Sequence, residues 1–274
     1  MASIGQIIFW SMIVLIFVCA GLIILLLAIA FSASQGTVET SAPFPVGNLG
    51  EDVVLECRFL TKSGTDRSSD VLITWEKEGL TGLVYQYKNN AAQLQDQNAQ
   101  FKDRAQLFTD AIAGGNASLL LRSVKMTDGG VYYCNVGAPG VWGRVRINLR
   151  VSVYSAPTIT KSNNSLRAEA PRWTATPSVT WVDQSGKQLN SSTQFTRFNN
   201  SGTEIVQVVS DLPGPLTAAV IYTCFIEDRL IKSVSEVTGD GDLKSSYFVT
   251  SSSPKMPPLQ LVCTTPLLLY MLAW

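Results

Sequence analysis

The 274 residues contain no histidine, and cysteine is the residue type whose covalent chemistry matters most here. Without histidine there are no His-based catalytic triads, Cys–His dyads or His metal sites. The sequence also contains no Cys-x-x-Cys pair, phosphate-binding loop or G-x-G-x-x-G motif. Asp240-Gly241-Asp242 could suggest calcium but is more typical of a solvated turn. We therefore expect no enzyme, no cofactor and no small-molecule substrate, and the chemistry expected of the cysteines is disulfide formation.

Two of the five cysteines belong to a framework of spaced aromatic residues. Residues 128–134 read D-x-G-x-Y-x-C, and Trp75 lies between Cys57 and Cys134. This set predicts an immunoglobulin-type β-sandwich in which Cys57 and Cys134 form a disulfide between the two sheets, with Trp75 packed against it. Tyr132, two residues before the second cysteine, is predicted to be a core residue whose hydroxyl bonds to the backbone upstream.

The first predicted domain covers residues 36–153. Apolar residues alternate before Cys57 and before Trp75, which is the pattern of half-buried strands. The long interval between Trp75 and Asp128 leaves room for additional strands, and this favours the variable type of the fold. Arg104 is predicted to form a salt bridge with Asp128 at the base of the sandwich.

A second domain of the constant type is predicted over residues 154–238. Trp181 and Tyr222 are its expected core landmarks, and Cys224 occupies the place of the second cysteine. The position expected to hold the partner cysteine is Ala168. The second sandwich is therefore predicted to lack its usual disulfide and to keep Cys224 as a free, buried and inert thiol. The fold class predicted is all-β, with two tandem sandwiches flanked by apolar segments.

The N-terminal segment, residues 1–32, is apolar and carries no charge. It is predicted to be a signal peptide, with Ala28-Ile29-Ala30 as an acceptable cleavage site. Because the apolar run is long and no basic residue precedes it, an uncleaved signal-anchor remains the alternative. Both interpretations place the domains outside the cytosol.

The C-terminal segment is predicted to anchor the chain to a membrane. Residues 239–258 are rich in Gly, Asp, Ser, Thr and Pro and predict a stalk. Residues 259–274 are apolar and are predicted to be either a short spanning tail or the signal for a glycolipid anchor. The predicted location is the extracellular face of the plasma membrane.

Sequons and charge balance agree with an extracellular location. Lysine plus arginine equals aspartate plus glutamate, 21 against 21, so the chain has no basic footprint for nucleic acid. The sequence N-x-[ST] predicts N-glycosylation at Asn116, Asn163, Asn190 and Asn199.

Several segments resemble the butyrophilin-like family of immunoglobulin co-signalling ligands on antigen-presenting cells. The resemblance extends over both predicted domains and rests on residues 1–10, 47–52, 75–79, 115–119 and 169–173. It implies a surface glycoprotein that binds a receptor on T cells and inhibits T-cell activation, proliferation and cytokine production. Ala168 departs from the family pattern, which expects cysteine there. The alternative function is a cell-adhesion molecule with homophilic or heterophilic binding.

Candidate receptor-binding residues come from the sheet that meets partners in variable-type domains. Tyr85 and Tyr87 share one strand face, and Val141 and Trp142 follow the predicted strand that ends in Cys134. Tyrosine and tryptophan are favoured interface anchors. Trp142 has an alternative role in closing the core, and Val141 is expected at an exposed loop tip. A glycan on Asn116 is expected to lie away from this contact face.

Overall fold

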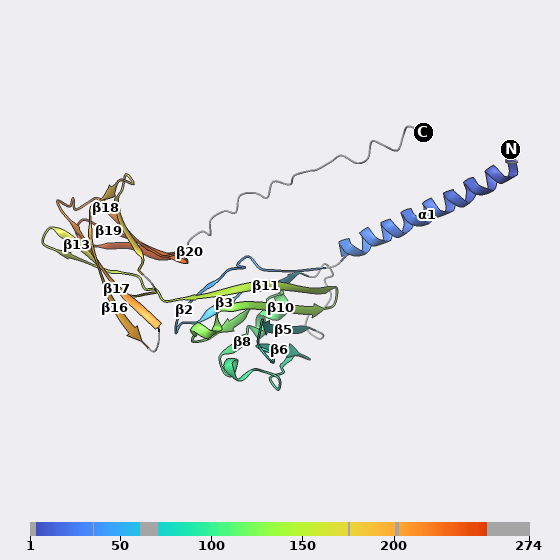
Figure 1. Cartoon of the computed structure of the whole chain (residues 1–274), viewed down its shortest axis with the longest axis horizontal. Helices are drawn as coiled ribbons and strands as arrows, with labels where there is room; N and C mark the ends of the chain where they lie inside the picture. The colour runs from blue at the N-terminus through green and yellow to red at the C-terminus, as the bar shows by residue number, and fades with distance from the viewer. Residues whose placement is uncertain (1–3, 35, 61–70, 175, 201–202, 251–274) are drawn as a thin grey trace. The chain divides into compact units, whose positions relative to one another are not determined.

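The computed structural model describes residues 4–34, 36–60, 71–174, 176–200 and 203–250, and Figure 1 shows the course of the chain. Its contacts divide the chain into two compact units, Met1–Tyr154 and Ser155–Trp274. Apart from one α-helix and three short 3-10 helices, the regular elements of the described residues are strands. The fold class is therefore all-β, as predicted.

The first unit is a sandwich of antiparallel sheets with one parallel edge. Among its described residues, one sheet has the order β2-β11-β10-β5-β6-β7, a second has the order β3-β9-β8, and β1 pairs with β4. The parallel pair is β2 with β11. The elements are β1 (Thr37–Glu39), β2 (Val46–Asn48), β3 (Val53–Leu55), β4 (Arg58–Leu60), β5 (Leu72–Lys77), β6 (Tyr85–Lys88), β7 (Ala91–Ala92), η1 (Ala99–Phe101), β8 (Ala105–Leu107), η2 (Thr109–Gly114), β9 (Leu119–Leu121), η3 (Met126–Asp128), β10 (Gly130–Ala138) and β11 (Val141–Ser152).

The core of this unit forms where the alternating apolar residues of the two sheets meet. Trp75 is fully buried, and its indole nitrogen donates a hydrogen bond to the carbonyl oxygen of Ala117 at 3.0 Å. The predicted disulfide between Cys57 and Cys134 is present, with 6.5 Å between the Cα atoms. Cys134 lies on β10, whereas Cys57 lies between β3 and β4, so the bond joins the two faces of the sandwich.

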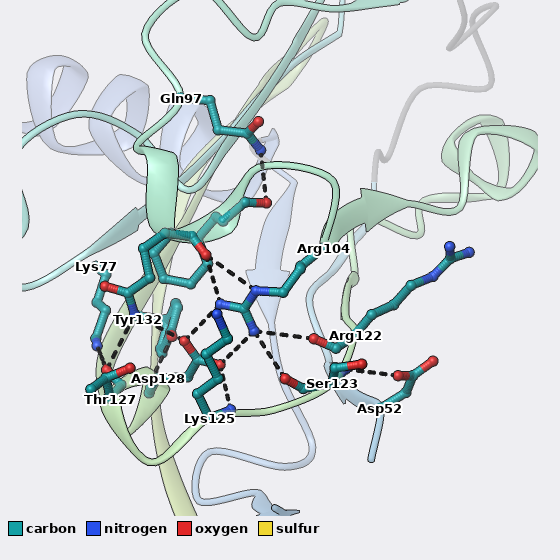
Figure 2. Close-up of polar contacts among 12 residues, drawn as sticks. Asp52, Lys77, Gln97, Arg104, Arg122, Ser123, Lys125, Thr127, Asp128 and Tyr132 are labelled. Atoms are coloured by element: carbon teal, nitrogen blue, oxygen red, sulfur yellow. Dashed lines mark hydrogen bonds and ion pairs between the residues drawn. The ribbon is translucent and has the colours of Figure 1, made fainter. Parts of the chain in front are cut away.

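A buried ion pair closes the base of the sandwich (Figure 2). The Asp128 carboxylate accepts hydrogen bonds from Arg104 through both oxygens, at 2.8 and 2.9 Å. It also accepts bonds from the Gln100 side chain and the Lys125 backbone. Burial raises the pKa of Asp128, but these hydrogen bonds outweigh it and hold that pKa below its usual value. The Tyr132 hydroxyl donates to the carbonyl oxygen of Asp128 at 2.6 Å, which ties the strand carrying Cys134 to the same corner.

The second unit contains two further packed sheets. Within its described residues the orders are β12-β13-β17-β16 and β15-β14-β18-β19-β20. Both sheets are antiparallel throughout. The elements are β12 (Thr158–Ser162), β13 (Ser165–Thr174), β14 (Ser178–Asp183), β15 (Gln188–Leu189), β16 (Ser192–Asn200), β17 (Thr203–Pro213), β18 (Ile221–Glu227), β19 (Ile231–Thr238) and β20 (Leu243–Thr250).

The second core has no disulfide among its described residues. Cys224 is a free and fully buried thiol, and burial raises its pKa to about 12. Ala168 is fully buried on β13 in the other sheet. Trp181 is also fully buried and donates to the Ser210 hydroxyl at 3.1 Å, while the Tyr222 hydroxyl accepts from the backbone nitrogen of Thr217. Packing and hydrogen bonds thus hold the sheets where a covalent bond is missing.

The prediction of a stalk over residues 239–258 is wrong for part of that range. Residues Leu243–Thr250 form β20, which pairs with β19 along its length. The turn before it contains Gly241, whose φ of 94° is in the left-handed region that favours glycine. The Gly, Asp and Ser content of this segment belongs to a hairpin, and Tyr247, Phe248 and Val249 supply the strand-forming residues. Residues 251–258 and the apolar tail at 259–274 lie outside the described residues.

The N-terminal segment is α1 (Ile4–Ser34). Within the part of the chain that the structure describes, Phe9–Leu27 is one stretch that is long and apolar enough to cross a membrane, and it is not buried. A signal sequence near the N-terminus can pass the same test of length and hydropathy. The helix therefore fits both a signal peptide and a signal-anchor.

Candidate interaction face

The outer surface of the six-stranded sheet presents a mixed aromatic and polar face. Strand alternation turns Ile73 and Trp75 into the core and leaves the neighbouring side chains of β5 on the other side. The same alternation on β10 and β11 follows from the buried positions of Cys134 and Ile147. We name this surface the front face; its members are Leu72, Thr74, Glu76, Gln86, Tyr133, Asn135, Trp142, Arg144 and Arg146.

Strand register brings these residues together from segments far apart in sequence. Asn135 on β10 lies opposite Thr74 on β5 and opposite Arg144 on β11. The Asn135 side chain donates to the Thr74 carbonyl oxygen, and the Gln86 side chain donates to the Thr74 hydroxyl, both at 3.4 Å. The β10–β11 hairpin thus continues into β5 and β6 as one surface.

Trp142 is the most exposed large apolar side chain of the described residues, at 80%. Its register partner is Gly137, and the indole ring lies directly over that glycine. A Cβ atom at Gly137 would stand 2.6 Å from Cζ3 of the Trp142 ring, which is too close for any real contact. Glycine at this position therefore allows the ring to lie against the sheet. Beside it is a hollow of about 460 Å³ lined by Leu72, Thr74, Asn135 and Arg144, among others.

Arg144 links the hydrophobic end of the front face to its charged end. Its guanidinium carbon lies 3.7 Å from the centre of the Tyr133 ring, and Nη2 lies 3.3 Å from Oε2 of Glu76. An exposed ion pair of this kind contributes at most about 1 kcal/mol to stability. Tyr133, Glu76 and Arg144 also line a second hollow of about 290 Å³, which includes Leu83. The Arg144 guanidinium thus stacks on the face of the Tyr133 ring, and neither side chain is buried.

The structure contradicts three of the four predicted contact residues. Tyr85 and Tyr87 point into the core and are 6% and 8% exposed. Tyr85 pairs with Trp75 across the sheet and therefore shares its inward side. Burial raises the pKa of Tyr85, and its hydroxyl bonds to the backbone of Leu107. Val141 is 3% exposed, so it is not at an exposed loop tip.

Trp142 lies on the front face, and its alternative role in closing the core is wrong. Pro139 and Gly140 form the turn between β10 and β11, so β11 already begins at Val141. Counting back from buried Ile147 in steps of two puts Val141 inward and Trp142 outward. That count was available in the sequence. The same alternation from Cys134 would have found Tyr133 and Asn135, which sequence reasoning missed.

The sequon asparagines lie outside the front face. Asn116 is half-buried just before β9 in the three-stranded sheet. The other three are exposed residues of the second unit, with Asn163 in the turn between β12 and β13 and Asn190 between β15 and β16, and with Asn199 near the end of β16. Within the described residues no three His, Cys, Asp or Glu side chains cluster in a way that could hold a metal ion.

Comparison with known proteins places these features in a family. The immunoglobulin V-set domain model matches residues 40–154. The human V-set domain-containing T-cell activation inhibitor 1 is 36% identical over 86% of this chain and 84% of its own length. Mouse butyrophilin-like protein 2 is 30% identical over 71% of this chain and 43% of its length. Among solved structures, the human B7-H4 IgV-like domain is 35% identical with a TM-score of 0.39, covering 42% of this chain and 96% of that one.

Proposed function

We propose that this chain, which belongs to the family of V-set domain-containing T-cell activation inhibitor 1, is a cell-surface ligand. It binds a receptor on the surface of T cells and inhibits T-cell activation. Proliferation and cytokine production are the outputs expected to fall. The relative that supports this proposal carries the inhibitory role in its name. Binding, with no catalytic step, is the whole of the proposed mechanism.

The observation that carries the proposal is the exposed Trp142 on the front face. An isolated soluble domain rarely exposes a tryptophan fully, because that side chain offers a large apolar surface. Trp, Tyr and Arg are the residues enriched in the energetic centres of interfaces, and here Trp142, Tyr133 and Arg144 occupy adjoining positions of one sheet. We infer that these three form the centre of the receptor contact.

The same residues suggest what the partner must supply. Trp142 needs an apolar pocket or a flat apolar side chain, and the hollow beside it can accept a small protruding group of the partner. Arg144 already shares its charge with Glu76. A carboxylate on the partner would compete with Glu76 for Arg144, and this would add selectivity more than affinity. The contact is therefore expected to depend chiefly on Trp142.

Anchoring is part of the proposal, because a ligand that acts across a cell–cell gap must be held at the surface. The α1 stretch Phe9–Leu27 is compatible with a cleaved signal or with a retained anchor. N-terminal sequencing of the mature chain from secretory cells distinguishes the two forms of α1.

The test uses the full chain displayed on cells that are co-cultured with stimulated T cells, with T-cell proliferation as the readout. Cells displaying the wild-type chain should lower proliferation, and the Trp142→Ala variant should lose this effect. A truncation at an interface centre costs about 2 kcal/mol or more, roughly 30-fold in affinity. Phe44→Ala is the matched control, because Phe44 is 52% exposed in the same unit and precedes β2, which pairs with Arg150–Ser152 at the opposite end of β11 from Trp142.

Surface levels of each variant are measured with an antibody to an added tag. Unchanged proliferation beside wild-type cells would overturn the inhibitory proposal. If the displaying cells instead aggregate with one another, and Trp142→Ala abolishes the aggregation, the front face is an adhesion surface. An equal effect of Trp142→Ala and Phe44→Ala would show that Trp142 is not the centre of the contact.

A further inference from the structure

The three-stranded sheet of the first unit also has an exposed outer surface, which carries two hollows. They measure about 470 and 420 Å³, and Phe108 lines both. Phe108 is 39% exposed and Val54, on β3, is 45% exposed. We name this surface the back face; its members are Val54, Glu56, Arg58, Gln106, Phe108, Asn116 and Leu120. It is an apolar centre with a charged pair, Glu56 and Arg58, at one side.

Asn116 lines the same hollow as Phe108 and is held there by its neighbours. Gly115 before it has a φ of 89°, and a Cβ atom at Gly115 would stand 2.2 Å from the Phe59 carbonyl oxygen, so the backbone approach requires glycine. The carboxamide oxygen of Asn116 accepts a hydrogen bond from the Ser118 nitrogen at 3.0 Å. This bond orients the Asn116 side chain so that its Nδ2 atom, to which an N-glycan is attached, lies on the side of the carboxamide away from the Ser118 nitrogen.

We propose that Asn116 carries an N-linked glycan whose first N-acetylglucosamine packs against Phe108 and fills the hollow on the back face. The occupant is thus the chain's own modification, and its attachment point is a wall of the hollow. A pyranose ring has one face made of C–H groups, which suits the negative face of an aromatic ring. Its hydroxyl groups at the ring edge can meet Glu56 and Arg58, which line the same hollow.

The chemistry of the back face differs from that of the front face in a way that supports this occupant. The back face has an apolar floor of Val54 and Phe108 with polar groups beside it, whereas the exposed Trp142 belongs to the six-stranded sheet. A tethered sugar needs little intrinsic affinity, because its attachment to Asn116 keeps it at high effective concentration. A covered back face would leave the front face as the free side of the sandwich. The inference does not depend on the proposed function.

The test is hydrogen–deuterium exchange on the full-length chain, produced in secretory cells that make trimmable high-mannose glycans. Mass spectrometry first establishes occupancy of Asn116. One sample keeps the whole glycan, one is trimmed to a single N-acetylglucosamine, and one has the glycan removed. We expect the first two to protect amides of residues 53–58 and 105–114 equally, and the third to exchange faster.

Variants at Phe108 separate sugar packing from a general effect of glycosylation. Phe108→Ala should exchange at the fast rate whether or not the sugar is present, and Phe108→Tyr, which keeps the ring, should behave like the wild type. Phe44→Ala is the control for loss of an exposed aromatic residue elsewhere in the unit. Removing the glycan at Asn163, whose preceding strand β12 contains no aromatic residue, should leave these amides unchanged.

An unoccupied Asn116 would overturn the proposal. So would exchange rates that ignore removal of the sugar in the wild type, or a sugar effect that persists in Phe108→Ala. The T-cell assay with Trp142→Ala is independent of every one of these outcomes. Failure of the glycan proposal is therefore distinguishable from failure of the proposed function.

Discussion

Replacing Asp128 with asparagine tests whether the ion pair at the base of the first sandwich holds its two sheets together. Each oxygen of the Asp128 carboxylate accepts from two donors: Oδ1 from Arg104 and Gln100, and Oδ2 from Arg104 and the Lys125 nitrogen. Either orientation of an asparagine amide therefore places an NH2 group against two donors. The variant also leaves Arg104, whose side chain is 13% exposed, without its counter-charge.

The expected loss follows from that geometry. Removing one partner of a buried ion pair costs about 3 to 5 kcal/mol, and the partial exposure of Arg104 favours the lower end. A loss of about 3 kcal/mol raises the opening equilibrium of the first unit roughly 100-fold. Amide exchange of β5 and β10 in the full chain reports that equilibrium, because these strands open only with the core. Glu76→Gln, which breaks an exposed pair in the same unit, should change the free energy by less than about 1 kcal/mol.

A double-mutant cycle with Arg104→Met completes the test. If the pair acts as a unit, the two losses are not additive, and the coupling should exceed about 1 kcal/mol. Equal small effects of Asp128→Asn and Glu76→Gln, or full additivity in the cycle, would refute the reasoning.

The same carboxylate predicts the acid limb of stability. The folded pKa of Asp128 lies below its ordinary value of 3.8, so its contribution is complete above that value and is lost as the pH falls through the folded pKa. The Asp128→Asn variant should lack this part of the acid dependence. Unfolding free energies of both proteins, measured from pH 7 down to the acid transition, check the sign.

Three further predictions concern single positions. Ala168→Cys should form a disulfide with Cys224, since both side chains are fully buried in facing sheets. The new bond should stabilise the second unit by about 2 to 4 kcal/mol. Thiol counting and thermal melting of the full chain test this. Cys224 should resist alkylation in the native chain at pH 8 and react only on unfolding, because burial raises its pKa to about 12; rapid native labelling would contradict this. Gly137→Ala should push the Trp142 ring off the sheet and weaken T-cell inhibition as Trp142→Ala does. The melting temperature of the variant should change little. Full inhibition by this variant would show that the position of the ring is irrelevant.

The framework of the first sandwich was predictable because few residues determine it. Cys57, Cys134 and Trp75 together form the centre of the core, and their spacing is typical of two sheets packed face to face as in the immunoglobulin fold. The orientation of the β6 tyrosines was not predictable in the same way. Whether Tyr85 points inward depends on its register with Trp75. The connection between β5 and β6 is long and contains two glycines at positive φ, Gly79 and Gly82, so the sequence alone does not fix this register.

The strand β20 illustrates a second limit of composition. The segment after Thr238 is rich in residues that form both linkers and turns, and composition alone does not separate them. What separates them is the β-propensity of Tyr247, Phe248 and Val249 within Leu243–Thr250. A domain boundary drawn from Gly and Asp content therefore ended the second sandwich one strand early.

The front face gains its rigidity from the residues directly behind it. On β10 the side chains of Tyr132 and Cys134 are fixed inward by a hydrogen bond and a disulfide, and those of Tyr133 and Asn135 project outward between them. A surface held in this way loses little conformational entropy on binding, so more of its contact energy appears as affinity. Loss of the Asp128 pair should therefore weaken receptor binding even though Asp128 lies off the front face. Staining of T cells by Asp128→Asn at a temperature where it remains folded would measure that coupling.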